Sequence, residues 1–239
     1  MFQKGIAMET KKFLIGSIPS VLYGDSGERC YLFLHGQMGY KEEAEAFAQV
    51  VCPKGYQVLA IDLPGHGDRQ NRGEELVPWT AVPDIQSAWD WAKGHWDKVA
   101  LRATSIGAYF ALACLDSPSQ ALLVSPILNM EQLILTMMDW VGVTEEQLRE
   151  QGKIATSFGQ TLSWKYLCWV REHPVRDWKC PVCLLYGSKD NMTPRQIVET
   201  YAQRSNVHLT VVEGGEHWFH TSEQLTELRK WEEQESRLV

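Results

Sequence analysis

Short apolar runs, bounded by glycine, proline and aspartate, alternate along the chain with longer segments whose apolar residues recur at helical spacing. This alternation is typical of a mostly parallel sheet with helices on both faces. The apolar runs predict eight strands, the first two close enough to form a hairpin. They are Lys12–Ile18, Val21–Tyr23, Cys30–Leu34, Gln57–Ile61, Val99–Ala103, Ala121–Val124, Val182–Tyr186 and Leu209–Val212.

The helical segments between these runs predict five scaffold helices. They are Lys41–Val51, Pro83–His95, Ile106–Leu115, Pro194–Arg204 and Ser222–Glu235. Pro83 and Pro194 each suit the first position of a helix, where proline loses no hydrogen bond, and Thr193 is the expected N-cap before Pro194.

One interval breaks the alternation, because more than fifty residues separate the strand ending at Val124 from the one starting at Val182. A structureless loop of that length is unusual in a compact domain. Helical patterns at Met130–Val141, Thr144–Gln151 and Trp164–Glu172 instead predict a helical insertion over residues 127–179. Since 239 residues compare with about 150 for an ordinary domain, we expect one domain, 1–239, carrying this insertion as a small cap.

The charge balance narrows the classes of partner. Lys and Arg number 23 against 30 Asp and Glu, a net charge of −7, which argues against nucleic acid or an anionic membrane surface as the main partner.

The longest apolar candidate for a membrane span, Ser105–Leu115, is too short and too interrupted to cross a membrane. The first residues, Met1–Glu9, lack the apolar core of a signal peptide, so we expect a cytoplasmic protein.

The six cysteines are scattered in mostly apolar surroundings, as expected for small buried side chains. Cys180 and Cys183 have the CxxC spacing of a redox or zinc site, but they open a predicted strand, where residues three apart face opposite sides. No second CxxC completes a zinc set. We therefore interpret this pair as core cysteines.

The most informative segment joins a predicted strand directly to a predicted helix through Ala103-Thr104-Ser105-Ile106-Gly107. A serine at such a tight turn has its hydroxyl lifted clear of the sheet, and the next N–H lies at a helix N-terminus, ready to bind an oxyanion. Ala103 replaces the first glycine of the G-x-S-x-G pattern, adding one methyl group. The alternative for Ser105 taken alone is a helix N-cap.

Two earlier turns accompany this segment. His35-Gly36 follows the strand Cys30–Leu34, and Asp62-Leu63-Pro64-Gly65-His66-Gly67 follows the next strand. With these three turns in order, the sequence resembles the α/β-hydrolase family over nearly the whole chain. The resemblance implies an α/β-hydrolase fold with a small helical cap after the sixth strand, and an oxyanion hole made by the backbone N–H groups of Gln37 and Ile106.

The family order of nucleophile, acid and histidine selects the remaining site residues. Asp190 lies in a loop just after a strand, and His217 follows the last strand in a glycine-rich loop. A serine hydroxyl needs an imidazole to take its proton and a carboxylate to orient that imidazole, so the predicted catalytic residues are Ser105, His217 and Asp190. The rivals are His220 for the base and Asp177, which precedes its strand, for the acid.

The other polar residues of these turns have predicted structural roles. We expect His35 and His66 to shape their loops and Asp62 to anchor its turn through bonds to the backbone. No His, Cys, Asp or Glu cluster has metal-site spacing, and the glycines fit neither a P-loop nor G-x-G-x-x-G. The sequence therefore implies no metal and no cofactor.

Tryptophan is abundant, with ten in the chain, and its distribution suggests a substrate site. We expect a lining that comprises Met38, Trp140, Trp164, Trp169 and Trp218. The alternative is that the tryptophans of the insertion, Trp178 included, simply pack the cap onto its base.

A serine at the turn favours acyl transfer, whereas epoxide hydrolases and dehalogenases of the family generally carry an aspartate there. The prediction is a serine hydrolase that cleaves a small or medium carboxylic ester, a small-molecule acyl substrate, through an acyl-enzyme. Thioesterase, peptidase or amidase, and carbon–carbon bond hydrolase activities use the same triad and stay open. A non-catalytic ligand-binding protein of the same fold is a further alternative.

Overall fold

The computed structural model describes residues 8–236. Its central element is an eight-stranded sheet with the order β1-β2-β4-β3-β5-β6-β9-β10. The strands are β1 (Thr10–Ile15), β2 (Ile18–Tyr23), β3 (Arg29–Leu34), β4 (Tyr56–Ile61), β5 (Lys98–Thr104), β6 (Ala121–Val124), β9 (Val182–Gly187) and β10 (Val207–Val212). The β1–β2 and β2–β4 pairs are antiparallel and all others are parallel, so the predicted mostly parallel sheet is confirmed.

Alternation along the strands divides the core between the two faces of the sheet. In β3, Leu32 and Leu34 belong to one buried cluster, whereas Tyr31 and Phe33 belong to the other. Helices α2 (Pro78–Lys93), α3 (Ser105–Cys114) and α7 (Arg195–Ala202) pack on the first cluster; α1 (Ala44–Val51) and α8 (Ser222–Glu235) pack on the second. Short 3₁₀ turns at Lys41–Glu43, Cys52–Lys54 and Gly67–Arg69 complete the connections.

Three predicted boundaries were wrong. The first hairpin turns at Gly16 and Ser17, where Gly16 has a φ of 60°, so Ile18 begins the second strand rather than ending the first. The second scaffold helix begins five residues earlier than predicted, at Pro78, which takes the favourable first position and leaves Pro83 inside the helix.

The third boundary lies at the start of α7, where Pro194 precedes the first helical residue. Thr193 does not cap this helix. Its hydroxyl donates to the carbonyl of Pro126 at 3.0 Å, and its N–H donates to the Asp190 carboxylate at 3.0 Å. Thr193 thus fastens the Asp190 loop to the segment after β6.

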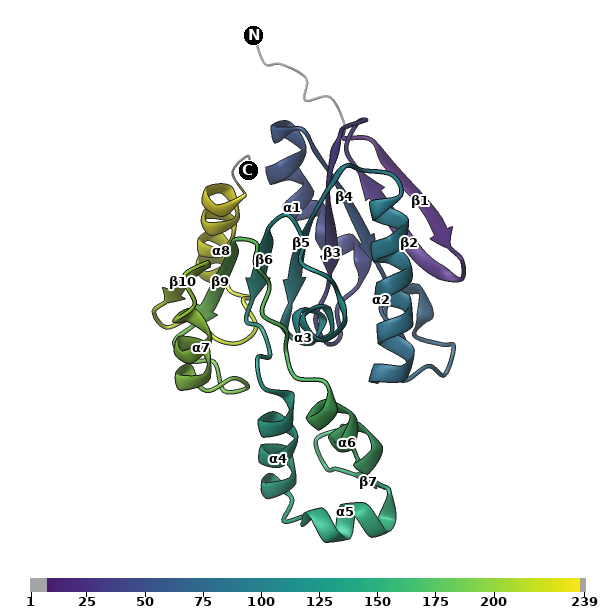
Figure 1. Cartoon of the computed structure of the whole chain (residues 1–239), viewed down its shortest axis with the longest axis vertical. Coiled ribbons are helices and arrows are strands. Elements are labelled where there is room, and N and C mark those ends of the chain that lie inside the picture. Colours follow the sequence, from purple (N-terminus) through teal and green to yellow (C-terminus); the bar gives the residue numbers. More distant parts are fainter. Residues whose placement is uncertain (1–7, 237–239) are drawn as a thin grey trace.

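The insertion leaves the sheet after β6 and returns to β9, as predicted. It contains α4 (Met130–Trp140), α5 (Glu145–Gln151) and α6 (Trp164–Glu172), together with a small hairpin of β7 (Lys153–Ala155) and β8 (Thr161–Ser163) that the sequence pattern did not predict. These elements lie beyond one end of the sheet, the end at which β5 leads into α3 (Figure 1). The insertion therefore stands at the carboxyl ends of the parallel strands, where sites form in open α/β sheets.

Within residues 8–236, none of the helices combines the length and apolar character that crossing a membrane requires. The prediction that the first residues do not form a signal peptide concerns Met1–Glu9, and residues 1–7 of that segment lie outside the described residues.

Candidate active site

Ser105 is the first residue of α3, immediately after β5, and has a φ of 50°, in the left-handed region. A non-glycine residue there is strained, and such strain is common at functional turns. The turn is tight against the neighbouring loop, since a Cβ at Gly107 would lie 2.4 Å from the carbonyl oxygen of His35. Glycine is thus required at position 107, whereas the alanine at 103 is fully buried and accommodated.

Ser105, His217 and Asp190 form one hydrogen-bonded chain. The Ser105 Oγ lies 2.8 Å from His217 Nε2, and His217 Nδ1 lies 2.7 Å from Asp190 Oδ2. The Asp190 side chain is fully buried, and its second oxygen accepts bonds from the N–H groups of Met192 and Thr193 at 2.8 and 3.0 Å. The carboxylate is therefore fixed on both oxygens and holds the imidazole toward the serine.

The loops carrying Asp190 and His217 meet at two glycines. A Cβ added at Gly187 would lie 2.5 Å from the backbone of Gly215, so neither loop could approach the other with a side chain at 187. The contact is fastened by the Lys189 N–H, which donates to the Gly215 carbonyl at 2.8 Å, and by the Gly214 N–H, which donates to the Ser188 hydroxyl at 2.8 Å. Close backbone packing thus sets the distance from the acid to the imidazole.

The two rival residues lie elsewhere. His220 is exposed, with Nδ1 at 2.8 Å from the Trp218 carbonyl oxygen and 3.4 Å from the Glu216 carboxylate. Asp177 is also exposed and pairs with Arg204 at 2.6 Å. The structure brings neither of them into the Ser105 chain.

Gln37 and Ile106 border the same cavity as Ser105, from the loop after β3 and from the first turn of α3. The first N–H groups of a helix have no partner within it, so the Ile106 N–H is available to an anion. His35 secures the Gln37 loop: its Nδ1 donates to the Gly36 carbonyl at 2.7 Å and its Nε2 accepts the Leu63 N–H at 3.0 Å. Burial lowers the pKa of His35 to about 4, so the ring is neutral at physiological pH, as this pair of bonds requires.

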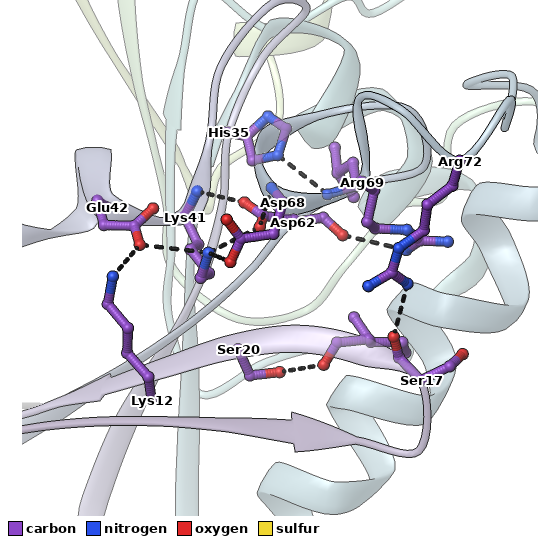
Figure 2. A network of polar contacts seen from close by, with 12 residues as sticks. Lys12, Ser17, Ser20, His35, Lys41, Glu42, Asp62, Asp68, Arg69 and Arg72 are labelled. Carbon is purple, nitrogen blue, oxygen red and sulfur yellow. Dashed lines mark hydrogen bonds and ion pairs between the residues drawn. The ribbon is translucent and has the colours of Figure 1, made fainter.

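An ion-pair network centred on the buried Lys41 and Asp62 side chains lies next to this loop (Figure 2). The Lys41 ammonium contacts Asp62 at 2.8 Å and Asp68 at 2.7 Å, while the Lys41 and Asp68 N–H groups also donate to the Asp62 carboxylate. Burial alone lowers the pKa of Lys41, but the bonds to Asp62 and Asp68 outweigh it and raise that pKa above its ordinary value. Asp62 thus anchors its turn as predicted, and also pairs with a lysine that the sequence did not single out.

Ser105 opens onto a cavity of about 320 Å³ between the sheet and the insertion. One wall is a single face of α4, formed by Met130, Leu133, Ile134 and Met137 at helical spacing. Further lining comes from Glu75, Leu76, Val77, Ile127, Lys153, Gln160, Thr161, Leu162, Ser163, Tyr166 and Met192. The cavity is therefore largely apolar, with the exposed Lys153–Glu75 ion pair, 2.9 Å apart, on its border.

The predicted substrate contacts do not border this cavity. Met38 and Trp218 are largely exposed, and Trp218 stacks on His220. Trp140 is also exposed and packs edge-on against Phe158. Trp169 stacks on His173, and Trp164 packs against the core.

The predicted residues and the lining of this cavity differ because large aromatic side chains indicate that a helix packs, but not which face of it meets a cavity. The signal that could have found the wall is the apolar spacing of 130, 133, 134 and 137 within α4.

Comparison with known proteins identifies the family. The model of a family described as the alpha/beta hydrolase family matches residues 31–230, which is most of the chain. The chain belongs to the alpha/beta hydrolase family. No curated protein sequence matches this hydrolase significantly.

Solved structures similar to this hydrolase include esterases. Est1E from Butyrivibrio proteoclasticus, in a structure with ferulic acid bound, has a TM-score of 0.73 at 18% identity, over 92% of this chain and 96% of that one. Mouse alpha/beta hydrolase domain-containing protein 10 has a TM-score of 0.71 at 16% identity, over 93% and 96% of the two chains. The Pyrococcus furiosus esterase Pf2001 has a TM-score of 0.63 at 16% identity, over 93% and 88%. These likenesses establish the fold.

Proposed function

We propose that this hydrolase is a serine esterase that cleaves a small or medium carboxylic ester through an acyl-enzyme on Ser105. The observation that carries the proposal is the chain from Ser105 Oγ through His217 to the buried Asp190, with distances of 2.8 and 2.7 Å, beside an apolar cavity. Esterases among the similar structures, one of them with ferulic acid bound, agree with this reaction class.

In the proposed mechanism, His217 Nε2 takes the Ser105 proton as the oxygen attacks the ester carbonyl. Asp190 holds the ring tautomer and stabilises the imidazolium. The backbone N–H groups of Gln37 and Ile106 stabilise the oxyanion of the tetrahedral intermediate. His217 then returns the proton to the departing alcohol, and water, activated by the same imidazole, hydrolyses the acyl-enzyme.

The cavity supports an apolar acyl group of limited size. Its volume of about 320 Å³ lies at the lower end of the range of about 300–1,000 Å³ that is typical of small-molecule sites. We infer that residues 127–179 act as a cap whose helix α4 contacts the acyl chain.

A fluorophosphonate probe tests the nucleophile. The probe is expected to attach to Ser105, as mapped by peptide mass spectrometry, and labelling is expected to vanish in Ser105→Ala. A folded wild-type protein that takes up no label and turns over no activated ester contradicts the proposal. Ester, thioester and amide of one acyl group, assayed side by side, then identify the leaving group.

A series of p-nitrophenyl esters tests the acyl pocket. Met137→Trp fills part of the cavity, so kcat/KM for the longest accepted chain is expected to fall about 10- to 200-fold while acetate is affected little. Trp140→Phe is the matched control, because Trp140 lies on the same helix outside the lining. An unchanged chain-length profile in Met137→Trp contradicts this placement of the acyl group.

A further inference from the structure

Three side chains from distant parts of the sequence converge at the end of the sheet remote from Ser105. The Glu235 carboxylate lies 3.2 Å from the Cys183 thiol through one oxygen and 3.2 Å from His208 Nδ1 through the other. The three potential ligand atoms all lie within 4.8 Å of one another. Among residues 8–236, this is the one group of cysteine, histidine and acidic side chains close enough to share an ion.

The sheet register explains the convergence. His208 in β10 is the direct partner of Cys183 in the neighbouring parallel strand β9, so the two side chains leave the same face of the sheet. Helix α8 packs on that face, and Glu235 is its last residue. Three elements of the fold thus each contribute one group.

The spacing suits a tetrahedral ion. For Zn²⁺ bonded at about 2.3 Å to sulfur and about 2.0 Å to nitrogen or oxygen, neighbouring ligands lie roughly 3.3–3.5 Å apart. The two 3.2 Å separations are close to these values, and they end on different oxygens of Glu235. One ligand atom from each residue lies within 4.8 Å of the other two, so shared binding requires the Glu235 carboxylate to rotate until one oxygen faces both partners.

The chemistry of the group favours zinc over the harder cations. A thiolate, an imidazole and a carboxylate are the ligands of Zn²⁺, whereas Mg²⁺ and Ca²⁺ prefer oxygen alone. Glu235 also stands at the carboxyl end of α8, where the helix dipole adds negative potential. The His208 side chain is 65% exposed, which gives an ion access and leaves room for water as a fourth ligand.

We propose that Cys183, His208 and Glu235 bind a zinc ion that fastens β9, β10 and α8 together. Cys183 lies near the start of β9, whereas Asp190 follows its end, so the ion stabilises the fold rather than taking part in the reaction at Ser105. Binding replaces the thiol proton, so affinity is expected to rise with pH. The competing interpretation is a hydrogen-bonded trio with no affinity for metal.

Metal-binding measurements on untagged, chelator-treated protein distinguish a zinc site from a hydrogen-bonded trio that binds no metal. Zinc is expected to bind one ion per chain by competition with a chromophoric chelator, and at a hundredfold excess over Kd to raise the Tm by roughly 5–10 °C. Cobalt(II) at the same site is expected to give a sulfur-to-metal charge-transfer band, which reports thiolate ligation directly.

Three variants and two controls locate the site. Cys183→Ser should abolish the cobalt band, and His208→Ala and Glu235→Gln should each weaken zinc binding by more than the roughly 10- to 100-fold typical of losing an outer-shell partner. Cys180→Ser, which removes the other cysteine of the CxxC pair, and His95→Ala, at an exposed histidine, should change neither. His208 is exposed, so its variant is informative even where a buried substitution prevents folding.

Absence of zinc binding by the folded wild-type protein overturns the proposal, and so does binding that survives His208→Ala unchanged. Neither readout requires esterase activity. The outcome is therefore independent of the function proposed for Ser105.

Discussion

Two polar networks lie at the carboxyl ends of the strands, each built on a fully buried carboxylate, Asp62 in one and Asp190 in the other. They differ in whether every polar group has a partner within the protein. In the Lys41 network, the ammonium and the Asp62 carboxylate find their partners within the protein, among Asp68, Glu42 and nearby backbone N–H groups. The Ser105 network is equally fixed at its Asp190 end, but its other end is a hydroxyl that borders the cavity. A closed network stabilises a turn, whereas an open one can act on a ligand.

The two networks are also held in place by different interactions. Charge pairing holds the Lys41 network, which joins the β1–β2 hairpin, through Lys12 and Glu42, to the turn after β4 (Figure 2). The Asp190 and His217 loops are held by backbone contact at Gly187 and Gly215, with no cation involved in that contact. This contrast predicts that substitutions in the first network change stability and those in the second change rate.

The largest effect is expected from His217→Ala, which removes the proposed base. The value of kcat/KM for an activated ester should fall about 10⁴- to 10⁶-fold with little change in the free energy of unfolding. His220→Ala is the control and should retain most activity, because His220 lies outside the network. Steady-state kinetics that show the greater loss in the His220 variant would reassign the base.

A smaller effect, on stability rather than rate, is expected from Lys41→Met. The lysine side chain is only 2% exposed, and removing it leaves the fully buried Asp62 carboxylate without its cation, which should cost about 3–5 kcal/mol of unfolding free energy. Lys12→Met is the control, because Lys12 is 63% exposed and its pair with Glu42 should contribute about 1 kcal/mol or less.

Urea unfolding measures both variants, and kcat/KM well below the Tm should fall far less in Lys41→Met than in His217→Ala. Equal losses of stability in the two lysine variants would show that burial of this pair does not matter.

The smallest effect concerns the neutral His35 that lies between the two networks. Because its folded pKa is about 4, against 6.5 for the unfolded chain, the folded state binds fewer protons than the unfolded state between these values. The free energy of unfolding should therefore decrease as the pH falls below 6.5. At pH 5 the loss due to His35 should be about 2 kcal/mol relative to neutral pH.

His35→Gln keeps an acceptor for the Leu63 N–H but cannot titrate, so urea unfolding at pH 7.5 and pH 5 should show a smaller loss than in the wild type. The exposed His95→Gln should match the wild type. Identical pH dependence in His35→Gln and wild type would contradict the assignment.

The turns could be predicted from the sequence because their requirements are local. Ser105 needs a strand before it, a helix after it and a small residue at 107. All three features can be recognised within about a dozen residues of the sequence. The same reasoning identified the loops of Asp190 and His217, and family order selected these residues over Asp177 and His220. Predictions failed where two local signals competed, as with Pro78 and Pro83 in α2.

The sequence by itself therefore determined the mostly parallel sheet, the insertion after β6 and the candidate Ser-His-Asp residues, because strand periodicity and turn chemistry depend on near neighbours. Only the tertiary structure decided that Lys41 pairs with Asp62, and that Cys183, His208 and Glu235 meet. Those outcomes depend on strand register and on the packing of helices far apart in the chain. The spacing of residues along the chain does not specify which residues of two strands are paired or which distant helices pack together.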